Sequence, residues 1–303
     1  MAGHSALVPR SLGARRAGAG YLFILPIVVF FAFFVGYPLV RSLYLSLTQW
    51  SGYGQPTFVG LRNFSELSTD PVFWHALGTT LVFTAVTMVL QTGLPLLLAT
   101  FLHRGWRGSV VFRTLLFIPA VISLVVTGVL WQLMYDSKFG AVNETLRSIG
   151  LGSLAHDWLG DPKTVVPAVI VVSVWQTLGL YLVVFLAGLQ GIDPTLYEAA
   201  SMDGANGRQR FRHITVPMLR TVTTVVLVLN MMNGLKTFDL IFVLSGGGPN
   251  HASEVLGTYL YGLAFGTSAG ATPALGYATA ISMVVLLLCM VGTVVQLRIS
   301  KRS

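Results

Sequence analysis

Long apolar stretches without charged residues alternate with polar segments along this chain. A helix of about 20 apolar residues is long enough to cross the hydrocarbon core of a bilayer. The pattern therefore predicts six membrane-spanning helices joined by short polar segments. Their approximate ranges are 21–40, 77–102, 114–135, 165–189, 217–244 and 276–297.

Two regions depart from this simple pattern. The fifth range contains Arg220, Lys236 and Asp239, so it is the only predicted span with ionisable residues in its interior. The uncharged stretch 255–297 is too long for one span, and Gly266 and Pro273 interrupt its first half. We expect that half to form an interfacial helix and a turn.

Composition supports a membrane protein over other classes. Hydrophobic residues make up 54% of the chain, charged residues 10%, and the mean hydropathy is +0.73. A soluble domain has about a quarter of its residues charged, so a soluble enzyme and a free nucleic-acid-binding module are excluded. Disorder is excluded because it requires low hydrophobicity. The fold class is thus an all-α integral membrane protein.

The single cysteine, Cys289, and the spacing of the histidines predict no metal site.

The distribution of charge predicts the orientation. If the N-terminus is inside, the inner segments hold 13 of the 19 basic residues and three of the 11 acidic ones. Cytoplasmic loops carry the excess of Lys and Arg, so both termini are expected inside, in contact with anionic inner-leaflet lipid. The net charge of +8 then requires no nucleic-acid partner. The expected organisation is a cytoplasmic segment 1–19, a first span with its outer loop 20–74, a permease core 75–298 and a cytoplasmic tail 299–303.

The longest polar inner segment, 190–217, joins the fourth and fifth spans. Asp193 can cap a helix that Pro194 begins, and Gly204 permits a left-handed turn that ends it. A second helix is expected from Asn206 to Pro217. These features are compatible with a helix-turn-helix on the membrane face, or with an ordinary amphipathic connector.

A family resemblance favours the first interpretation. The segment resembles the EAA loop of the membrane subunits of ABC importers. Residues at the family's spacing are Glu198, Ala199, Ala200, Asp203, Gly204, Ala205, Phe211, Ile214 and Pro217. Flanking segments, among them Phe58–Phe64 and Gly246–Pro249, resemble the carbohydrate branch, which includes the maltose and glycerol-3-phosphate permeases. The resemblance covers about residues 20–300.

The resemblance implies a type I ABC importer permease fold in a bacterial inner membrane. In that family the EAA loop is a coupling helix that docks on a cytoplasmic ATPase. Glu198 would be a polar anchor there, Ala199, Ala200 and Ala205 would permit close approach, and Gly204 would make the turn. Phe211 and Ile214 would bind the loop to its own helices.

The same resemblance implies partners. These would be a second homologous permease subunit, two copies of a cytoplasmic ABC ATPase and an extracytoplasmic solute-binding protein. ATP and Mg would bind to the ATPase subunits, since this sequence contains no G-x-x-x-x-G-K-[ST] phosphate loop. Neither a catalytic residue set nor a cofactor of its own is therefore expected in this chain.

A sugar route needs polar and aromatic side chains inside the bundle. The fourth predicted span offers Trp175, Gln176 and Tyr181, and the fifth offers Asn230 and Asn233. Polar residues within a membrane commonly face a bundle interior or a water-filled path. The alternative is that they join helices by hydrogen bonds. Lys236 and Asp239, three residues apart, are expected to form an ion pair near the outer interface.

Three functional hypotheses remain at this point. The first is a transport subunit of an ABC importer for a sugar, oligosaccharide, amino sugar or glycerol-phosphate compound. The second is a stand-alone secondary transporter of a small polar solute, which would need ionisable residues deep in several spans. The third is a membrane anchor or scaffold, which would have no need of a coupling loop.

Overall fold

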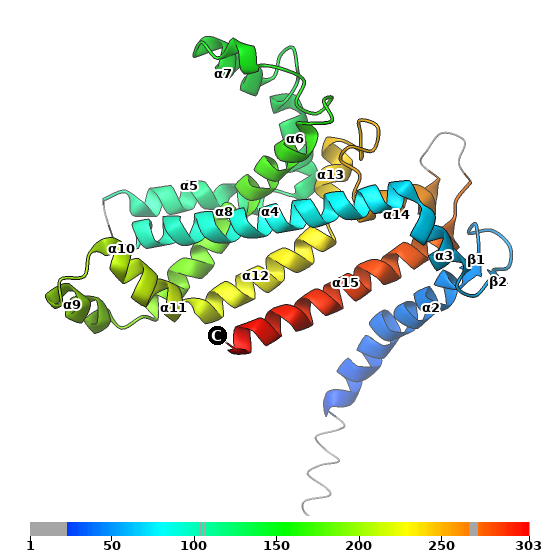
Figure 1. Ribbon diagram of the computed structural model, residues 1–303, viewed down its shortest axis with the longest axis horizontal. Helices are drawn as coiled ribbons and strands as arrows, with labels where there is room; N and C mark the ends of the chain where they lie inside the picture. The colour runs from blue at the N-terminus through cyan, green and yellow to red at the C-terminus, as the bar shows by residue number, and fades with distance from the viewer. Residues whose placement is uncertain (1–22, 104, 106, 267–271, 303) are drawn as a thin grey trace, which may run out of the picture.

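A computed structural model describes residues 23–103, 105, 107–266 and 272–302 of the chain (Figure 1). The predicted cytoplasmic segment 1–19 lies outside these described residues. Apart from two short strands, the regular elements of the described part are helices, as the apolar stretches predicted.

Four helices are long and apolar enough to cross a membrane, and there are up to six spans if each of two bent helix pairs counts as one. The four are Phe23–Ser46, α4 (Pro71–Leu102), α8 (Val165–Gln190) and the span Leu275–Ile299 within α15 (Leu275–Arg302). The first of them includes η1 (Ala32–Gly36) and α2 (Tyr37–Ser46). They confirm the first, second, fourth and sixth predicted spans.

The third predicted span, 114–135, is wrong as a continuous helix. Its place is taken by α5 (Ser109–Val121) and α6 (Leu124–Met134), which meet at an angle of 103°. Ile122 is extended, with φ −76° and ψ 136°, so the helical hydrogen bonding stops there. The carbonyl of Ile122 accepts a hydrogen bond from Nε2 of Gln176 at 3.1 Å. A side chain of α8 therefore satisfies a backbone group that the break leaves without its helical partner.

The fifth predicted span, 217–244, is also wrong as a continuous helix. A bend of 69° separates α12 (Arg220–Leu235) from the helical segment before it. After α12 the chain leaves the helix, and α13 (Asp239–Leu244) forms separately. The second break lies where Lys236 and Asp239 interrupt the apolar sequence.

The core of the bundle is formed around α8, which packs against α4 and α5, while α12 packs against α4. Small residues allow close approach at two of these contacts. A Cβ on Gly179 of α8 would collide with the backbone of Leu116 and Phe117 in α5. One on Gly234 of α12 would meet Thr84 of α4 at 2.8 Å.

The short elements gather at opposite ends of the long helices (Figure 1). The predicted outer end carries a two-stranded antiparallel sheet, α3 (Arg62–Thr69) and α14 (Leu256–Phe265). The sequence predicted a helix at the position of α14, and its interfacial location stays a prediction. The other end carries α9 and the three helical segments that follow it. The strands are β1 (Thr48–Gln49) and β2 (Thr57–Phe58). The four helical segments at the other end are α9 (Pro194–Met202), α10 (Gly207–Arg210), η3 (Phe211–Thr215) and α11 (Val216–Met218).

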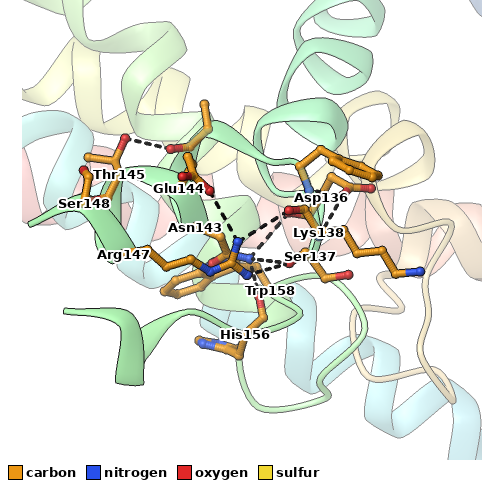
Figure 2. Close-up of polar contacts among 12 residues, drawn as sticks. Asp136, Ser137, Lys138, Asn143, Glu144, Thr145, Arg147, Ser148, His156 and Trp158 are labelled. Carbon is orange, nitrogen blue, oxygen red and sulfur yellow. Dashed lines mark hydrogen bonds and ion pairs between the residues drawn. The ribbon is translucent and has the colours of Figure 1, made fainter. Parts of the chain in front are cut away.

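The loop between α6 and α8 contains α7 (Ala141–Ser148) and η2 (Gly152–Leu154), and α7 stands apart from the long helices in Figure 1. Figure 2 shows that this loop is held by its own polar side chains. Asn143 is fully buried, accepts a hydrogen bond from Nε1 of Trp158 at 2.8 Å and donates one to the His156 carbonyl at 2.9 Å. One amide side chain thereby joins the two halves of the loop.

Candidate functional site

The predicted coupling segment starts with a capped helix, α9. Oδ1 of Asp193 accepts a hydrogen bond from the backbone N–H of Thr195 at 2.9 Å, and Pro194 is the first helical residue. Hydrogen bonds from Thr195 hold the pKa of Asp193 below its usual value. Gly204, with φ +78°, ends the helix in the left-handed region. The local geometry expected from the sequence is therefore confirmed.

The second half of the segment begins with another cap. Oδ1 of Asn206 accepts from the Gln209 backbone N–H at 2.9 Å, and the Gln209 side chain accepts from the Asn206 backbone N–H at 2.7 Å. This reciprocal capping box satisfies two backbone donors at a helix start. The helix predicted from Asn206 onward is present, although a π-helical turn, η3, interrupts it.

Side chains also cross-link the two halves. Nη1 of Arg210 donates to Oγ of Ser201 at 2.7 Å, and the hydroxyls of Tyr197 and Thr215 are 3.0 Å apart. Ile214 and Tyr197 pack against the hydrophobic cluster around Phe185 and Leu189 of α8. The segment is thus a braced unit that is attached to the bundle through its contacts with α8.

The surface of the segment divides the motif residues into two groups. Exposed residues are Glu198, Ala199, Asp203 and Gly204, while Ala200, Ala205, Phe211 and Ile214 are half-buried. Pro217 lies in α11. Met202, which the sequence analysis did not select, is 89% exposed beside Asp203. The sequence contained a signal for this residue. A flexible apolar side chain on a predicted docking face can fill an irregular partner surface.

A second candidate site is a polar cavity of about 300 Å³ between α4, α8, α12 and α13. Three of the five predicted path residues line it: Gln176, Tyr181 and Asn233. The Tyr181 hydroxyl lies near the Asn233 side chain. Hydroxyl and amide groups in one cavity can recognise a hydroxylated solute, because both donate and accept hydrogen bonds.

The other two predicted path residues lie elsewhere. The Trp175 ring packs edge-on against Trp131 of α6, with ring centres 5.4 Å apart. Asn230 is 1% exposed, and its Nδ2 donates to Oγ1 of Thr92 in α4 at 3.3 Å. In this structure both residues make contacts between helices.

The cavity also contains polar residues that the sequence analysis missed. Nε2 of Gln91 donates to Oγ of Ser173 at 2.9 Å, and Thr87 and Thr177 lie nearby in the lining. A signal existed in α4, where a polar stripe recurs at helical spacing within an apolar helix. That stripe is Thr80, Thr84, Thr87 and Gln91.

Lys236 and Asp239 line the same cavity from the break after α12. Neither forms an ion pair with a described residue, so the predicted pairing between them is wrong. The reason is the break, since the three-residue spacing brings side chains together only on a continuous helix. Both residues are exposed. Across the described ranges, no group of three His, Cys, Asp or Glu residues could hold a metal ion.

Comparison with known proteins gives a consistent result. The family described as "Binding-protein-dependent transport system inner membrane component" matches residues 91–303. A probable ABC transporter permease protein of Bacillus subtilis, YurN, is 39% identical over 286 residues, covering 93% of this chain and 95% of the relative. The trehalose/maltose permease protein MalF of Thermococcus litoralis is 34% identical, with 95% of both chains covered.

A solved structure is similar as well. It is the crystal structure of a bacterial ABC transporter involved in the import of the acidic polysaccharide alginate. One of its chains matches with a TM-score of 0.81 and 26% identity, covering 95% of this chain and 96% of that chain.

Proposed function

Because the chain belongs to the family of inner membrane components of binding-protein-dependent transport systems, we propose that it is the permease subunit of an ATP-driven importer for a sugar or sugar-like solute. It would form part of the translocation path and couple that path to separate ATPase subunits. The observation that carries this proposal is the continuity of α8. This helix runs from the cavity residues Gln176 and Tyr181 to Gln190, four residues before the first residue of α9.

The coupling role is assigned to the exposed face of α9. Glu198 and Asp203 present charge there, and Ala199 leaves room for close approach by an ATPase surface. The contacts between Arg210 and Ser201 and between Tyr197 and Thr215 support this role. A short braced helix transmits displacement, whereas a flexible loop would absorb it. Phe211, Ile214 and Pro217 would hold the segment to its own spans.

The assembly would contain a second homologous permease subunit and two copies of a cytoplasmic ABC ATPase, which bind ATP and Mg. An extracytoplasmic solute-binding protein would deliver the solute. The alginate transporter was solved in complex with an alginate pentasaccharide-bound periplasmic protein, which supports such a partner here. This chain would carry no catalytic site and no cofactor of its own.

The solute class follows from the cavity and from the relatives. The cavity offers the hydroxyl of Tyr181, the amides of Gln176 and Asn233, and the two charges of Lys236 and Asp239. Similar chains are named for transport of trehalose and maltose, lactose, and arabinooligosaccharides. A sugar, oligosaccharide or other polyhydroxylated compound fits both observations.

The proposed organisation places both termini in the cytoplasm. The first span and its outer loop occupy 20–74, and the permease core with five further spans occupies 75–298. The coupling segment 190–217 and the tail 299–303 would lie on the cytoplasmic side. Since α9 and the C-terminal end of α15 follow inward-running spans in this scheme, the coupling segment is on the side where ATP is available.

The test is charge reversal at the coupling face. In vesicles reconstituted with the full transporter and its binding protein, Glu198→Lys should reduce solute uptake and solute-stimulated ATP hydrolysis by about fivefold or more. Insertion and subunit assembly should stay normal, because Glu198 is exposed. Glu66→Lys is the matched control, since Glu66 makes only an exposed ion pair with Arg62 in α3.

Two outcomes would contradict the proposal. Equal coupling in Glu198→Lys and Glu66→Lys would remove α9 from the coupling interface. Uptake that continues when ATP hydrolysis is blocked would favour a stand-alone secondary transporter.

A further inference from the structure

A cavity of about 500 Å³ lies at the inner end of α4, beside the coupling segment. One wall is the last part of α4, and the other is formed by the turn after α8, by α9 and by η3. Neither the proposed solute path nor the exposed face of α9 uses this space.

The floor of the cavity is apolar. Leu97 of α4, Leu189 of α8 and Phe211 of η3 contribute to its lining. Leu97 is 55% exposed and lies in the last two turns of a membrane-spanning helix. At that depth an acyl chain can cover the exposed leucine and this part of the cavity without entering water.

The rim of the cavity is basic. His103, Arg208 and Arg210 line it, and no acidic residue is among the described lining residues. Arg210 uses one guanidinium nitrogen on Ser201, whereas no ion pair engages Arg208 within the described chain. His103 follows directly after Leu102, the last residue of the span. His103 therefore marks the level where the hydrocarbon ends and lipid headgroups begin, and Arg208 and Arg210 line the same cavity.

We propose that this cavity binds one anionic phospholipid of the inner leaflet. Its phosphate would lie against Arg208 and Arg210, and one acyl chain would pass along Leu97 and Phe211. Basic pockets on the cytoplasmic side of spanning helices bind acidic headgroups, since charge and hydrophobic burial act together there. A soluble phosphate would leave the apolar floor uncovered, and an acidic peptide of a partner would have to place its backbone in hydrocarbon.

Such a lipid would contact both α4 and the coupling segment. Its occupancy would hold α9 and η3 against the end of α4, so anionic lipid content would alter how well ATP hydrolysis is coupled to transport. This consequence rests on the proposed function, whereas the binding itself does not.

The test measures lipid binding directly. The full transporter is purified from nanodiscs of phosphatidylcholine with increasing phosphatidylglycerol, and native mass spectrometry counts the phosphatidylglycerol retained. Arg208→Gln should weaken apparent affinity about fivefold, as expected for one cationic residue near the membrane surface. Arg208→Lys should retain most of it. Arg212→Gln is the matched control, because Arg212 is exposed in the same segment but does not line the cavity.

Three results would overturn the proposal. Equal weakening in Arg208→Gln and Arg212→Gln would indicate general attraction to a charged surface, and unchanged binding in Arg208→Gln would exclude the site. Equal binding of soluble glycerol 1-phosphate would identify a soluble anion as the occupant.

Loss of lipid binding in Arg208→Gln alongside normal coupling in Glu198→Lys would support the lipid site and remove the proposed coupling role.

Discussion

The Tyr277 hydroxyl at the start of α15 donates a hydrogen bond of 2.7 Å to Oδ2 of Asp70, the residue that caps α4. The Tyr259 hydroxyl of α14 donates to the same oxygen. Oδ1 of Asp70 accepts from the backbone N–H groups of Val72 and Phe73. One carboxylate thus joins three helices at the predicted outer end of the bundle.

Removal of one of these donors should destabilise the outer end. Tyr277→Phe deletes a hydrogen bond to a charged acceptor, so the free energy of unfolding should fall by about 1–3 kcal/mol. Thermal unfolding of the purified protein in detergent measures the change. Tyr53→Phe is the control, because Tyr53 is 82% exposed. Equal melting temperatures for the two variants would show that the hydrogen bond from Tyr277 to Asp70 contributes no measurable stability.

The stability of the protein should depend on pH through Asp70. Burial alone would raise the pKa of Asp70, but hydrogen bonds from Tyr259, Tyr277 and the amides of Phe73 and Val72 lower it below 3.8. A carboxyl group with a lowered folded-state pKa contributes stability above its unfolded pKa, and that stability is lost as pH falls through the folded value. The wild type should therefore lose more stability than Asp70→Asn on acidification below about pH 4. Parallel melting curves for the two proteins across this range would contradict the assignment.

The caps and the turn of segment 190–217 could be predicted from the sequence, because their geometry is local. The caps at Asp193 and Asn206 and the turn at Gly204 depend on neighbours within three or four positions. The breaks in the third and fifth spans could not be predicted in this way. The carbonyl released at Ile122 is satisfied by Gln176, 54 residues later, and no sequence window connects the two.

The cavity was predicted only in part, for a related reason. Trp175 and Gln176 are adjacent in an apolar helix, and only packing decides which of them faces the cavity. Trp175 turns towards Trp131 because α6 bends back at Ile122. That bend is a tertiary feature. The polar stripe of α4 that includes Gln91 is visible in the sequence, but only the structure places it in this cavity.

Gly204 should be needed for its backbone conformation. Its φ is +78°, and a Cβ there would meet no atom within 4 Å in this chain. Gly204→Ala should therefore strain the turn by about 1–2 kcal/mol and lower the solute transported per ATP hydrolysed. Gly204→Asn should be milder, since Asn tolerates the left-handed region. Equal losses for Ala and Asn would instead indicate that any side chain blocks approach of the ATPase.

Gly179 should be required for a different reason, the contact between α8 and α5. A Cβ at this position collides with the backbone of Leu116 and Phe117, which cannot move as a side chain can. Gly179→Ala should cost about 1–3 kcal/mol through overpacking and reduce the folded fraction seen by fluorescence-detected size-exclusion chromatography. Gly93→Ala in α4 is the control, because a Cβ there meets no atom within 4 Å. Equal folded fractions would mean that α5 and α8 separate easily.

Asn233 and Asn230 lie three residues apart on α12 and should respond differently to truncation. Asn233 is exposed to the polar cavity and lies near the Tyr181 hydroxyl. Asn233→Ala should therefore raise the KM for uptake about tenfold, which corresponds to the loss of one hydrogen bond to the solute. Assembly should be unaffected, as it should be in the neighbouring control Met232→Ala.

Asn230→Ala should act on folding, because the Asn230 side chain is buried and donates to Thr92 of α4. Its folded fraction should fall while the KM of the protein that does fold stays within about twofold, since loss of a buried interhelical hydrogen bond costs about 1 kcal/mol without touching the cavity. Uptake kinetics and size-exclusion profiles of the same preparations separate the two effects. If Asn233→Ala reduced the folded fraction and left KM unchanged, both asparagines would serve only to join helices, and the solute path would have to lie elsewhere in the bundle.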